Sequence, residues 1–338
     1  MRRLLFIAVL IATLPLPIAG QELRLPNKPG SVKFAVIGDT GTGDKHQVAI
    51  ANELASWRTR YAFDFVVMMG DNLYGGENPK DFDKKFGAPY KPILDAGVKF
   101  YAALGNHDDA ALQRNYKPFN MNGERFYSFK PQNGVRFFAL DSNYVDKAQL
   151  DWLEKELTAS GSEWKIMYFH HPLYSSGETH GSAELQRGLL EPVFLKHGVN
   201  VVLSGHEHFY ERIKPQKGIA YFIIGSSAKL RTGDLSKSDL TAYGNDQEYA
   251  FMLMEIVGDE LYFQTINQSG KTITRAVSGA LARSSRRPAA AHSQSCRRPS
   301  RRRLSRDRDR ANESITPNFQ RPTSKGVRLG SWELGVGS

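Results

Sequence analysis

The stretch VVLSGHEHFYER, residues 201–212, places His206 and His208 directly after a short aliphatic run and a glycine. Imidazole is a common metal ligand, so two such rings at the end of a strand can contribute to a metal site. Histidines in an HxH pattern also occur by chance. The pattern therefore predicts a metal site only if other parts of the chain supply further ligands.

Five apolar runs along the chain each deliver a potential metal ligand at their carboxyl ends. The runs are 31–38, 64–70, 98–105, 164–170 and 199–205. The side chains that end or follow them are Asp39, Asp71, Asn106, His170 and the pair His206 and His208. Open α/β sheets bind ligands at the carboxyl ends of their strands, and glycine allows the sharp turn there. Any one of these residues alone could be a cap, a turn residue or a core histidine, but together they predict one metal site.

The ligand types restrict the metal. Carboxylate, amide oxygen and imidazole without thiolate favour iron, manganese or zinc. The number of donors exceeds what one tetrahedral zinc ion uses, which favours two metals that share a bridging carboxylate. Two-metal sites are typical of phosphate ester hydrolysis.

Strands and helices alternate in the sequence, and this alternation must position the ligands. The five runs are rich in Val, Ile, Phe and Met and predict central strands covered on both faces. Residues 45–57 and 147–160 have apolar positions at helical spacing, so an α/β core is expected. Further β-structure is predicted for a hairpin over 122–140 with its turn at Asn133-Gly134, and for C-terminal strands with turns at Gly258-Asp259 and Ser269-Gly270.

The chain begins with a pattern typical of a secretory signal peptide. Arg2 and Arg3 precede an apolar stretch over 4–18, and small residues follow at 19–20. This stretch is too short and too interrupted by proline to span a bilayer, and no later segment is apolar enough to do so. We therefore expect cleavage of residues 1–20, a secreted or periplasmic protein, and no membrane contact after cleavage. The single cysteine, Cys296, cannot form an internal disulfide, which favours a bacterial periplasm or medium over an animal secretory route.

The formal net charge of +10 belongs to the C-terminal residues 281–338. They contain 14 Lys and Arg against 4 Asp and Glu, so residues 1–280 hold 31 of each sign. The tail is rich in Arg, Ser and Pro and cannot bury enough apolar surface to fold alone. We expect a catalytic domain over 21–280, a disordered basic tail over 281–338, and no nucleic-acid partner. The composition of the tail fits a functional extension and a read-through or frameshifted end equally well.

The order of five short motifs and the residues within them resemble those of the calcineurin-like metallophosphoesterase superfamily. The motifs are GDTG (38–41), GDNLY (70–74), GNHD (105–108), HHP (170–172) and GHEH (205–208). Tyr74 in the second motif narrows the resemblance to the small, tartrate-resistant type of purple acid phosphatase. The resemblance spans residues 31–278 and implies a four-layer α/β sandwich, in which two β-sheets are flanked by helices and the metals lie at the strand ends.

The same resemblance implies a role for each ligand. A ferric ion would be bound by Asp39, Tyr74 and His208, and Asp71 would bridge it to the second metal. A divalent Fe, Zn or Mn would be bound by Asn106, His170 and His206.

Two further histidines, His107 and His180, match family residues that contact the phosphate or the leaving group. The loop SSGETHG, which carries His180, is one residue longer than the family pattern, and Met167 replaces the usual Val of the motif before His170. We expect His107 and His180 to donate a proton or a hydrogen bond to the departing oxygen.

The function that the resemblance implies is hydrolysis of phosphate monoesters, on small molecules or proteins, by a metal-bound hydroxide. A phosphodiesterase or nucleotide hydrolase on the same scaffold, and a non-catalytic phosphate-binding protein, are the alternatives. The loops around 75–95, 110–121 and 228–245 would decide between substrates. Basic residues expected near the site could contact a substrate or be ordinary surface charge: Arg212, Lys229 and Arg231.

Overall fold

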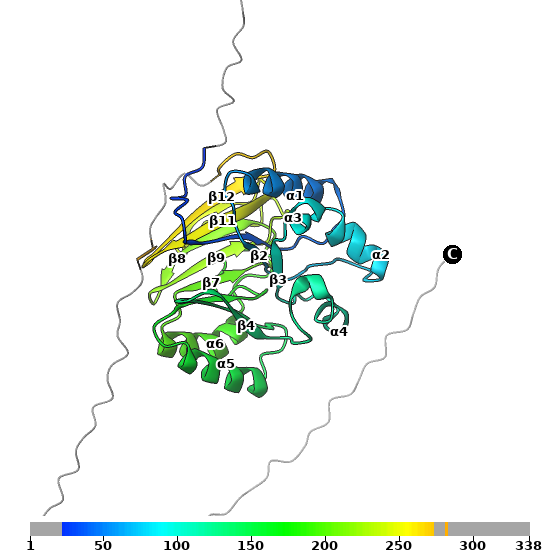
Figure 1. The fold of residues 1–338 in the computed structure, drawn as a ribbon. Coiled ribbons are helices and arrows are strands. Elements are labelled where there is room, and N and C mark those ends of the chain that lie inside the picture. Colours follow the sequence, from blue (N-terminus) through cyan, green and yellow to red (C-terminus); the bar gives the residue numbers. More distant parts are fainter. Residues whose placement is uncertain (1–21, 274–280, 283–338) are drawn as a thin grey trace, which may run out of the picture. The chain divides into compact units, whose positions relative to one another are not determined.

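The computed structural model of the chain describes residues 22–273 and 281–282. The predicted signal peptide, Cys296 and all but two residues of the predicted basic tail lie outside these ranges. Two β-sheets lie face to face, with helices on both outer sides (Figure 1). This arrangement confirms the predicted four-layer α/β sandwich.

The first sheet has six strands in the order β13-β12-β11-β1-β2-β3. Its strands β1, β2 and β3 run parallel, whereas β11 pairs antiparallel with β1. The strands are β1 (Val32–Ile37), β2 (Phe65–Met68), β3 (Lys99–Ala102), β11 (Ala250–Val257), β12 (Glu260–Asn267) and β13 (Leu281–Ala282).

The second sheet has seven strands in the order β10-β8-β9-β7-β6-β5-β4. Its centre, β5-β6-β7-β9, is parallel, and β4 and β5 form the hairpin predicted around Asn133-Gly134. The strands are β4 (Tyr127–Gln132), β5 (Val135–Ala139), β6 (Trp164–Tyr168), β7 (Val201–Ser204), β8 (Tyr210–Gln216), β9 (Ile219–Ile224) and β10 (Thr241–Asn245).

The helices cover the two outer faces. Figure 1 shows α1 (Lys45–Arg58) and α3 (Lys91–Asp95) on the side of the first sheet, and α5 (Lys147–Ala159) and α6 (Glu184–His197) on the side of the second. The predicted starts of α1 and α5 are confirmed, since Asp44 and Asp146 accept hydrogen bonds from the first turns. Short elements complete the fold: α2 (Pro79–Phe82), a π-helical turn (Asp83–Gly87), α4 (Ala110–Gln113) and a 3-10 turn (Lys117–Phe119).

Aromatic rings from both sheets make the core between them. Phe137 of β5 packs edge-on against Phe34 of β1 at 5.0 Å and against Phe65 of β2 at 5.2 Å between ring centroids. All three rings are buried. Such edge-to-face pairs stabilise beyond the area they bury, so these contacts fix how the two sheets stack.

The strands that carry the predicted ligands are divided between the two sheets. Strands β1, β2 and β3 belong to the first sheet, and β6 and β7 to the second. The ligands therefore meet across the edge shared by two stacked sheets rather than along one open sheet. Apolar runs buried on both faces look alike in either arrangement, so the runs alone do not distinguish one sheet from two.

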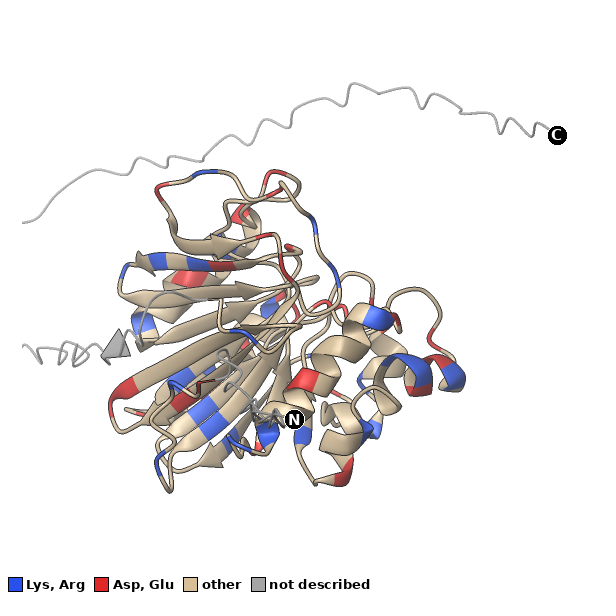
Figure 2. Cartoon of the chain, turned by 90° about the horizontal axis from the view of Figure 1, so that it is seen from above, with Lys and Arg blue, Asp and Glu red and all other residues tan. Residues whose placement is uncertain are grey.

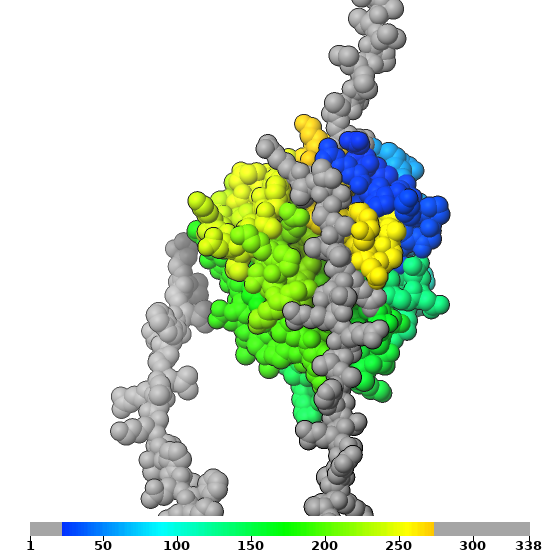
Figure 3. Space-filling model, turned by 90° about the vertical axis from the view of Figure 1, so that its left-hand side faces the viewer, coloured from blue at the N-terminus to red at the C-terminus, as the bar shows by residue number. Residues whose placement is uncertain are grey.

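The N-terminal described residues pack along the C-terminal strands. The Glu255 carboxylate on β11 accepts hydrogen bonds from the backbone of Asn27 and Lys28 and from the Ser31 hydroxyl. Figure 3 shows the dark blue N-terminal residues beside the yellow C-terminal strands. These contacts tie the N-terminal described residues to β11, an inner strand of the first sheet.

Charges of both signs are interspersed over the described residues, as Figure 2 shows. The balance of 31 basic and 31 acidic residues over positions 1–280 agrees with this picture. Within residues 22–273, no helix has the length and apolarity that crossing a bilayer requires.

Candidate metal centre

The structure brings together the seven predicted metal ligands from five strand ends. Asp39 follows β1, Asp71 and Tyr74 follow β2, and Asn106 follows β3; His170 follows β6, and His206 and His208 follow β7. Three of these residues have left-handed backbone conformations, with φ of 55° at Asp39, 50° at Asp71 and 69° at His206. Non-glycine residues rarely adopt such angles, and strained backbone of this kind concentrates at functional sites.

One half of the cluster is centred on Tyr74. Its hydroxyl donates to Oδ1 of Asp39 at 3.1 Å and lies 3.3 Å from Nε2 of His208. Nε2 of His208 is in turn 3.5 Å from Oδ1 of Asp39. One ligand atom each from Asp39, Asp71 and His208 lies within 4.8 Å of the others. These side chains can share one metal ion.

The other half is centred on His170. Its Nε2 lies 2.9 Å from Oδ1 of Asn106, 3.1 Å from Nδ1 of His206 and 3.3 Å from Oδ1 of Asp71. Asp71 therefore belongs to both halves. It lies close to Asp39 and His208, and its Oδ1 also contacts His170. This position is the one expected of a carboxylate that bridges two metals.

The protonation of His170 shows that this half suits a cation. Nδ1 of His170 lies 2.9 Å from the carbonyl oxygen of Met69, which can only accept a hydrogen bond, so Nδ1 carries the hydrogen. Complete burial lowers the pKa of His170 well below its usual value, and the ring is neutral. Its Nε2 lone pair then faces the oxygens of Asn106 and Asp71. A cation between these atoms turns mutual repulsion into coordination.

The electrostatics of the whole cluster favour bound positive charge. Burial, followed by the charge of Asp71, raises the pKa of Asp39 well above its usual value. Burial also raises the pKa of the Tyr74 phenol, and it lowers the pKa of His206 to about 2 and of His208 to about 4. These imidazoles are thus neutral, and the buried Asp39 carboxyl and Tyr74 phenol require a cation to be held as anions.

The two predicted catalytic histidines lie on the solvent side of the cluster. The His107 side chain is 54% exposed, and its Nε2 is 4.0 Å from Oδ2 of Asp71. The His180 side chain is 35% exposed, and its ring lies 4.2 Å from that of His206 between centroids. The longer loop therefore still brings His180 to the site, and both rings can reach a ligand that enters from solvent.

Asp108 has a role that the sequence did not reveal. Its carboxylate accepts hydrogen bonds from the backbone of Gly105 and Leu73 and from the side chains of Asn72 and Gln113. It therefore joins the ligand loop after β2 to the ligand loop after β3. In the sequence, only the acidic residue at the end of the GNHD motif and the Asn of the GDN motif indicated this link.

Glu207 was likewise unassigned. Its side chain is buried between the two ligand histidines of GHEH, and Oε1 accepts from the backbone N–H of Gly181 at 2.7 Å. Its Oε2 lies 3.5 Å from Nδ1 of His180. Glu207 thus holds the His180 loop against the metal-binding loop after β7. In the sequence, the position of Glu207 between the predicted ligands His206 and His208 was the only indication of this role.

Two of the three basic residues considered above border the site. Nζ of Lys229 lies 4.5 Å from the centroid of the Tyr74 ring, and Nη1 of Arg231 lies 3.5 Å from Nδ1 of His180. Arg212, in contrast, packs over the Phe263 ring of β12 at 5.3 Å. Lys229 and Arg231 are therefore placed to meet an anionic ligand, and Arg212 serves the packing of the sheets.

Comparison with known proteins identifies the class of protein. Residues 32–210 match the calcineurin-like phosphoesterase family model, and the chain belongs to this family. Its relatives include Purple acid phosphatase 17 of Arabidopsis thaliana, 29% identical over an alignment of 244 residues that covers 61% of this chain and 71% of the relative. Tartrate-resistant acid phosphatase type 5 of Homo sapiens is 26% identical over 306 residues, covering 75% of this chain and 94% of the relative. The predicted resemblance to purple acid phosphatases is confirmed.

Two solved structures share the fold. GAP50, described as the anchor in the inner membrane complex of Plasmodium, has a TM-score of 0.65 and 19% identity over 76% of this chain and 90% of its own. The purple acid phosphatase PPD1 from yellow lupin (Lupinus luteus) has a TM-score of 0.60 and 17% identity over 73% of this chain and 53% of its own. The family, its relatives and the ligand cluster together identify a phosphoesterase of the dinuclear-metal type.

Proposed function

We propose that the protein is an exported acid phosphatase that hydrolyses phosphate monoesters with one ferric and one divalent metal ion. The observation that carries this proposal is the position of the Tyr74 hydroxyl, which contacts Asp39 and His208 inside the ligand cluster. A phenol has an unperturbed pKa near 10, and burial raises that of Tyr74 further. A trivalent ion supplies enough positive charge to hold such a residue as a phenolate.

The ligand roles follow from the two halves of the cluster. The ferric ion fits the half formed by Asp39, Tyr74 and His208, and a divalent Fe, Zn or Mn fits the half formed by Asn106, His170 and His206, with Asp71 between them. When bound, the metal pair polarises phosphoryl oxygens and lowers the pKa of the attacking water.

His107 and His180 act on the leaving group. His107 and His180 lie on the solvent side of the cluster, where either ring can donate a proton to the departing alkoxide. Proton donation of this kind contributes about 10²- to 10⁴-fold to a rate. Asp108 and Glu207 hold the two loops that carry these histidines.

The two alternatives make different demands on the site. GAP50 shares the fold, and that likeness carries no activity to this chain. A protein that only bound phosphate would have no need of seven metal ligands and two solvent-side histidines in one cluster. A phosphodiesterase would use the same ligands, so only substrate preference separates it from a monoesterase.

The test is a hydrolysis panel on metal-analysed protein. Purified protein, analysed for Fe, Zn and Mn, is assayed from pH 4 to pH 8 with phenyl phosphate, glycerol phosphate, ATP and bis(p-nitrophenyl) phosphate. We expect monoester hydrolysis with an acidic optimum, absent from Asp71→Asn purified in the same way. Preference for the diester would make the protein a phosphodiesterase, and a metal-loaded protein without hydrolysis would be a binding protein.

Export rests on the N-terminal sequence. Arg2 and Arg3, the apolar stretch over 4–18 and the small residues at 19–20 support secretion or a periplasmic location, where small-molecule or protein phosphate esters would be the substrates. Expression of the full chain in a Gram-negative host, followed by N-terminal sequencing of the periplasmic fraction, tests this. Retention of an uncleaved chain in the cytoplasm would contradict export.

A further inference from the structure

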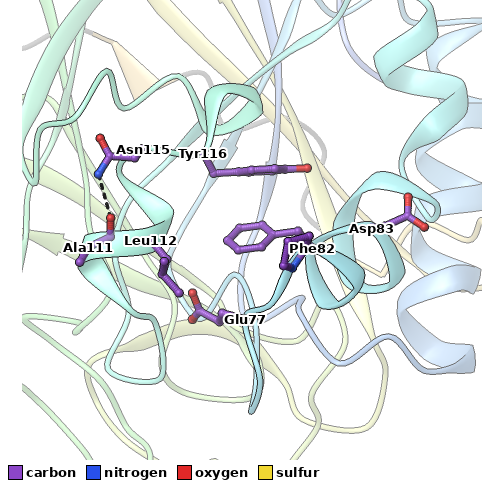
Figure 4. A pocket seen from close by; sticks show the side chains of 8 residues that line it. Glu77, Phe82, Asp83, Ala111, Leu112, Asn115 and Tyr116 are labelled. Carbon is purple, nitrogen blue, oxygen red and sulfur yellow. Dashed lines mark hydrogen bonds between the residues drawn. The ribbon is translucent and has the colours of Figure 1, made fainter.

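A cavity of about 540 Å³ lies between α2 and α4, beside the ligand loops. Figure 4 shows its lining, with the Tyr116 and Phe82 rings one above the other and Glu77 and Leu112 beside them. The residues that matter here are Glu77, Phe82, Asp83, Ala111, Leu112 and Tyr116. We refer to this cavity as the α2–α4 slot.

Both walls of the slot are continuations of the ligand loops. Glu77 is three residues beyond Tyr74, so their Cα atoms lie within about 11 Å of each other. The opposite wall begins with α4, whose N-cap residue Asp109 is two residues beyond His107. The backbone N–H of Asp109 donates to Oε1 of Glu77 at 2.8 Å and joins the walls. The two walls therefore begin three residues beyond Tyr74 and two residues beyond His107, next to the candidate metal centre along the chain.

The lining of the slot combines an apolar surface with one carboxylate oxygen that lacks a donor. The Phe82 and Tyr116 rings lie 4.2 Å apart between centroids, and Leu112 leaves 48% of its surface exposed. Oε1 of Glu77 accepts from Asp109 and from Nε2 of Gln113, whereas Oε2 is buried with no hydrogen-bond partner among the described residues. A buried carboxylate oxygen without a donor is costly. A positive charge in the slot would offset that cost.

The acidic residues at the slot favour a ligand with a positively charged group. Burial raises the pKa of the Glu77 carboxyl, and a neighbouring cation would favour its ionised form. Asp83 on the lining adds a second acidic group. An ammonium group on an apolar body is thus the complement of this surface, since it supplies a charge-assisted hydrogen bond and leaves the body to pack on the rings.

We propose that the α2–α4 slot binds the organic part of the substrate and selects an aromatic group that carries an ammonium. The ring packs against Phe82, Tyr116 and Leu112, and the ammonium pairs with the negative charge of the Glu77 carboxylate. This inference rests on the proposed function, because the phosphoryl group of the same ester would be held at the metal centre.

Two esters that differ only in the ammonium arm test the selection. Phosphotyramine and phenyl phosphate share the reacting group, and only the first carries an aminoethyl arm. We expect kcat/KM for phosphotyramine to exceed that for phenyl phosphate about tenfold in the wild type. Glu77→Gln should bring the two values together, because the amide keeps the acceptor for Asp109 and loses the charge. Ala111→Trp should fill the slot and lower kcat/KM for phosphotyramine about tenfold.

Matched controls lie on α6, away from the slot. Glu184→Gln removes an exposed carboxylate, and Leu185→Trp adds an indole at a position 74% exposed. Both should keep the tenfold preference. Equal kcat/KM values for the two esters in the wild type would overturn the proposed selection.

A binding measurement separates failure of the slot from failure of the proposed function. Tyramine, which has no phosphate, is titrated into the chain and followed by ligand-observed NMR. We expect binding that Glu77→Gln and Ala111→Trp each weaken about tenfold. Such binding without hydrolysis of either ester would overturn the phosphatase and support the slot. Hydrolysis together with tyramine binding that neither variant changes would overturn the slot alone.

Discussion

Replacement of Tyr74 by Phe removes one oxygen atom from the candidate metal centre and keeps the ring. The lost hydroxyl lies 3.1 Å from Oδ1 of Asp39 and 3.3 Å from Nε2 of His208. The packing of the ring against His107 and beneath Lys229 is retained, because those contacts involve the ring itself. The change therefore isolates the contribution of the phenolate from that of the fold.

The size of the effect follows from the contacts that are lost. Interactions with a charged group contribute about 1.5–3 kcal/mol each. A loss of about 2 kcal/mol corresponds to about 30-fold weaker iron binding. The other six predicted ligands remain, so we expect reduced iron occupancy and partial hydrolysis rather than complete loss.

Colour provides the assay. The oxidised wild type should be violet to pink from phenolate-to-iron charge transfer, and Tyr74→Phe should lose this colour at equal iron loading. Tyr144→Phe, at a position 71% exposed, is the matched control and should keep it. Visible spectra recorded alongside iron analysis test whether Tyr74 binds the ferric ion. A colourless, iron-loaded, oxidised wild type would refute a Tyr74 ferric ligand and move the protein into the broader group of divalent-metal phosphoesterases.

Four further changes probe the other assignments. His107→Ala should keep both metals and lower turnover about 10²-fold, as loss of a general acid does; metal loss or unchanged turnover would rule out that role. Asp71→Asn should lose activity and at least one metal, and a fully loaded, active variant would contradict the bridging position. Glu207→Gln should keep its acceptor for Gly181 and both metals, but lower kcat more for glycerol phosphate than for phenyl phosphate, because His180 assists poor leaving groups most; an equal effect on both would leave Glu207 a purely structural role. A chain that ends after residue 282 should stay folded, metal-loaded and active, and an insoluble or metal-free product would show that the tail belongs to the fold.

The sequence by itself indicated most of the local elements and the candidate metal ligands. Buried strands, capped helices and glycine turns depend on residues close together in the chain, so the runs before Asp39, Asp71 and Asn106 could be interpreted as strands from their composition. The start of α1 after Asp44 followed in the same way. Helix α6 was not assigned from the sequence, and its interior contains Gly188 and Pro192, two residues that disfavour a helix.

Which atoms face each other was decided only by the tertiary structure. The backbone N–H of His206 donates to Oδ2 of Asp39 across 167 residues of chain, and Nδ1 of His170 meets the carbonyl of Met69 across 101. Nε2 of Gln113 on α4 likewise donates to Oε1 of Glu77 across 36 residues. Contacts of this kind depend on how two sheets stack, and stacking is set by the summed packing of many side chains such as Phe34 and Phe137. No local pattern encodes that sum, so the sequence indicated the candidate ligands but not their geometry.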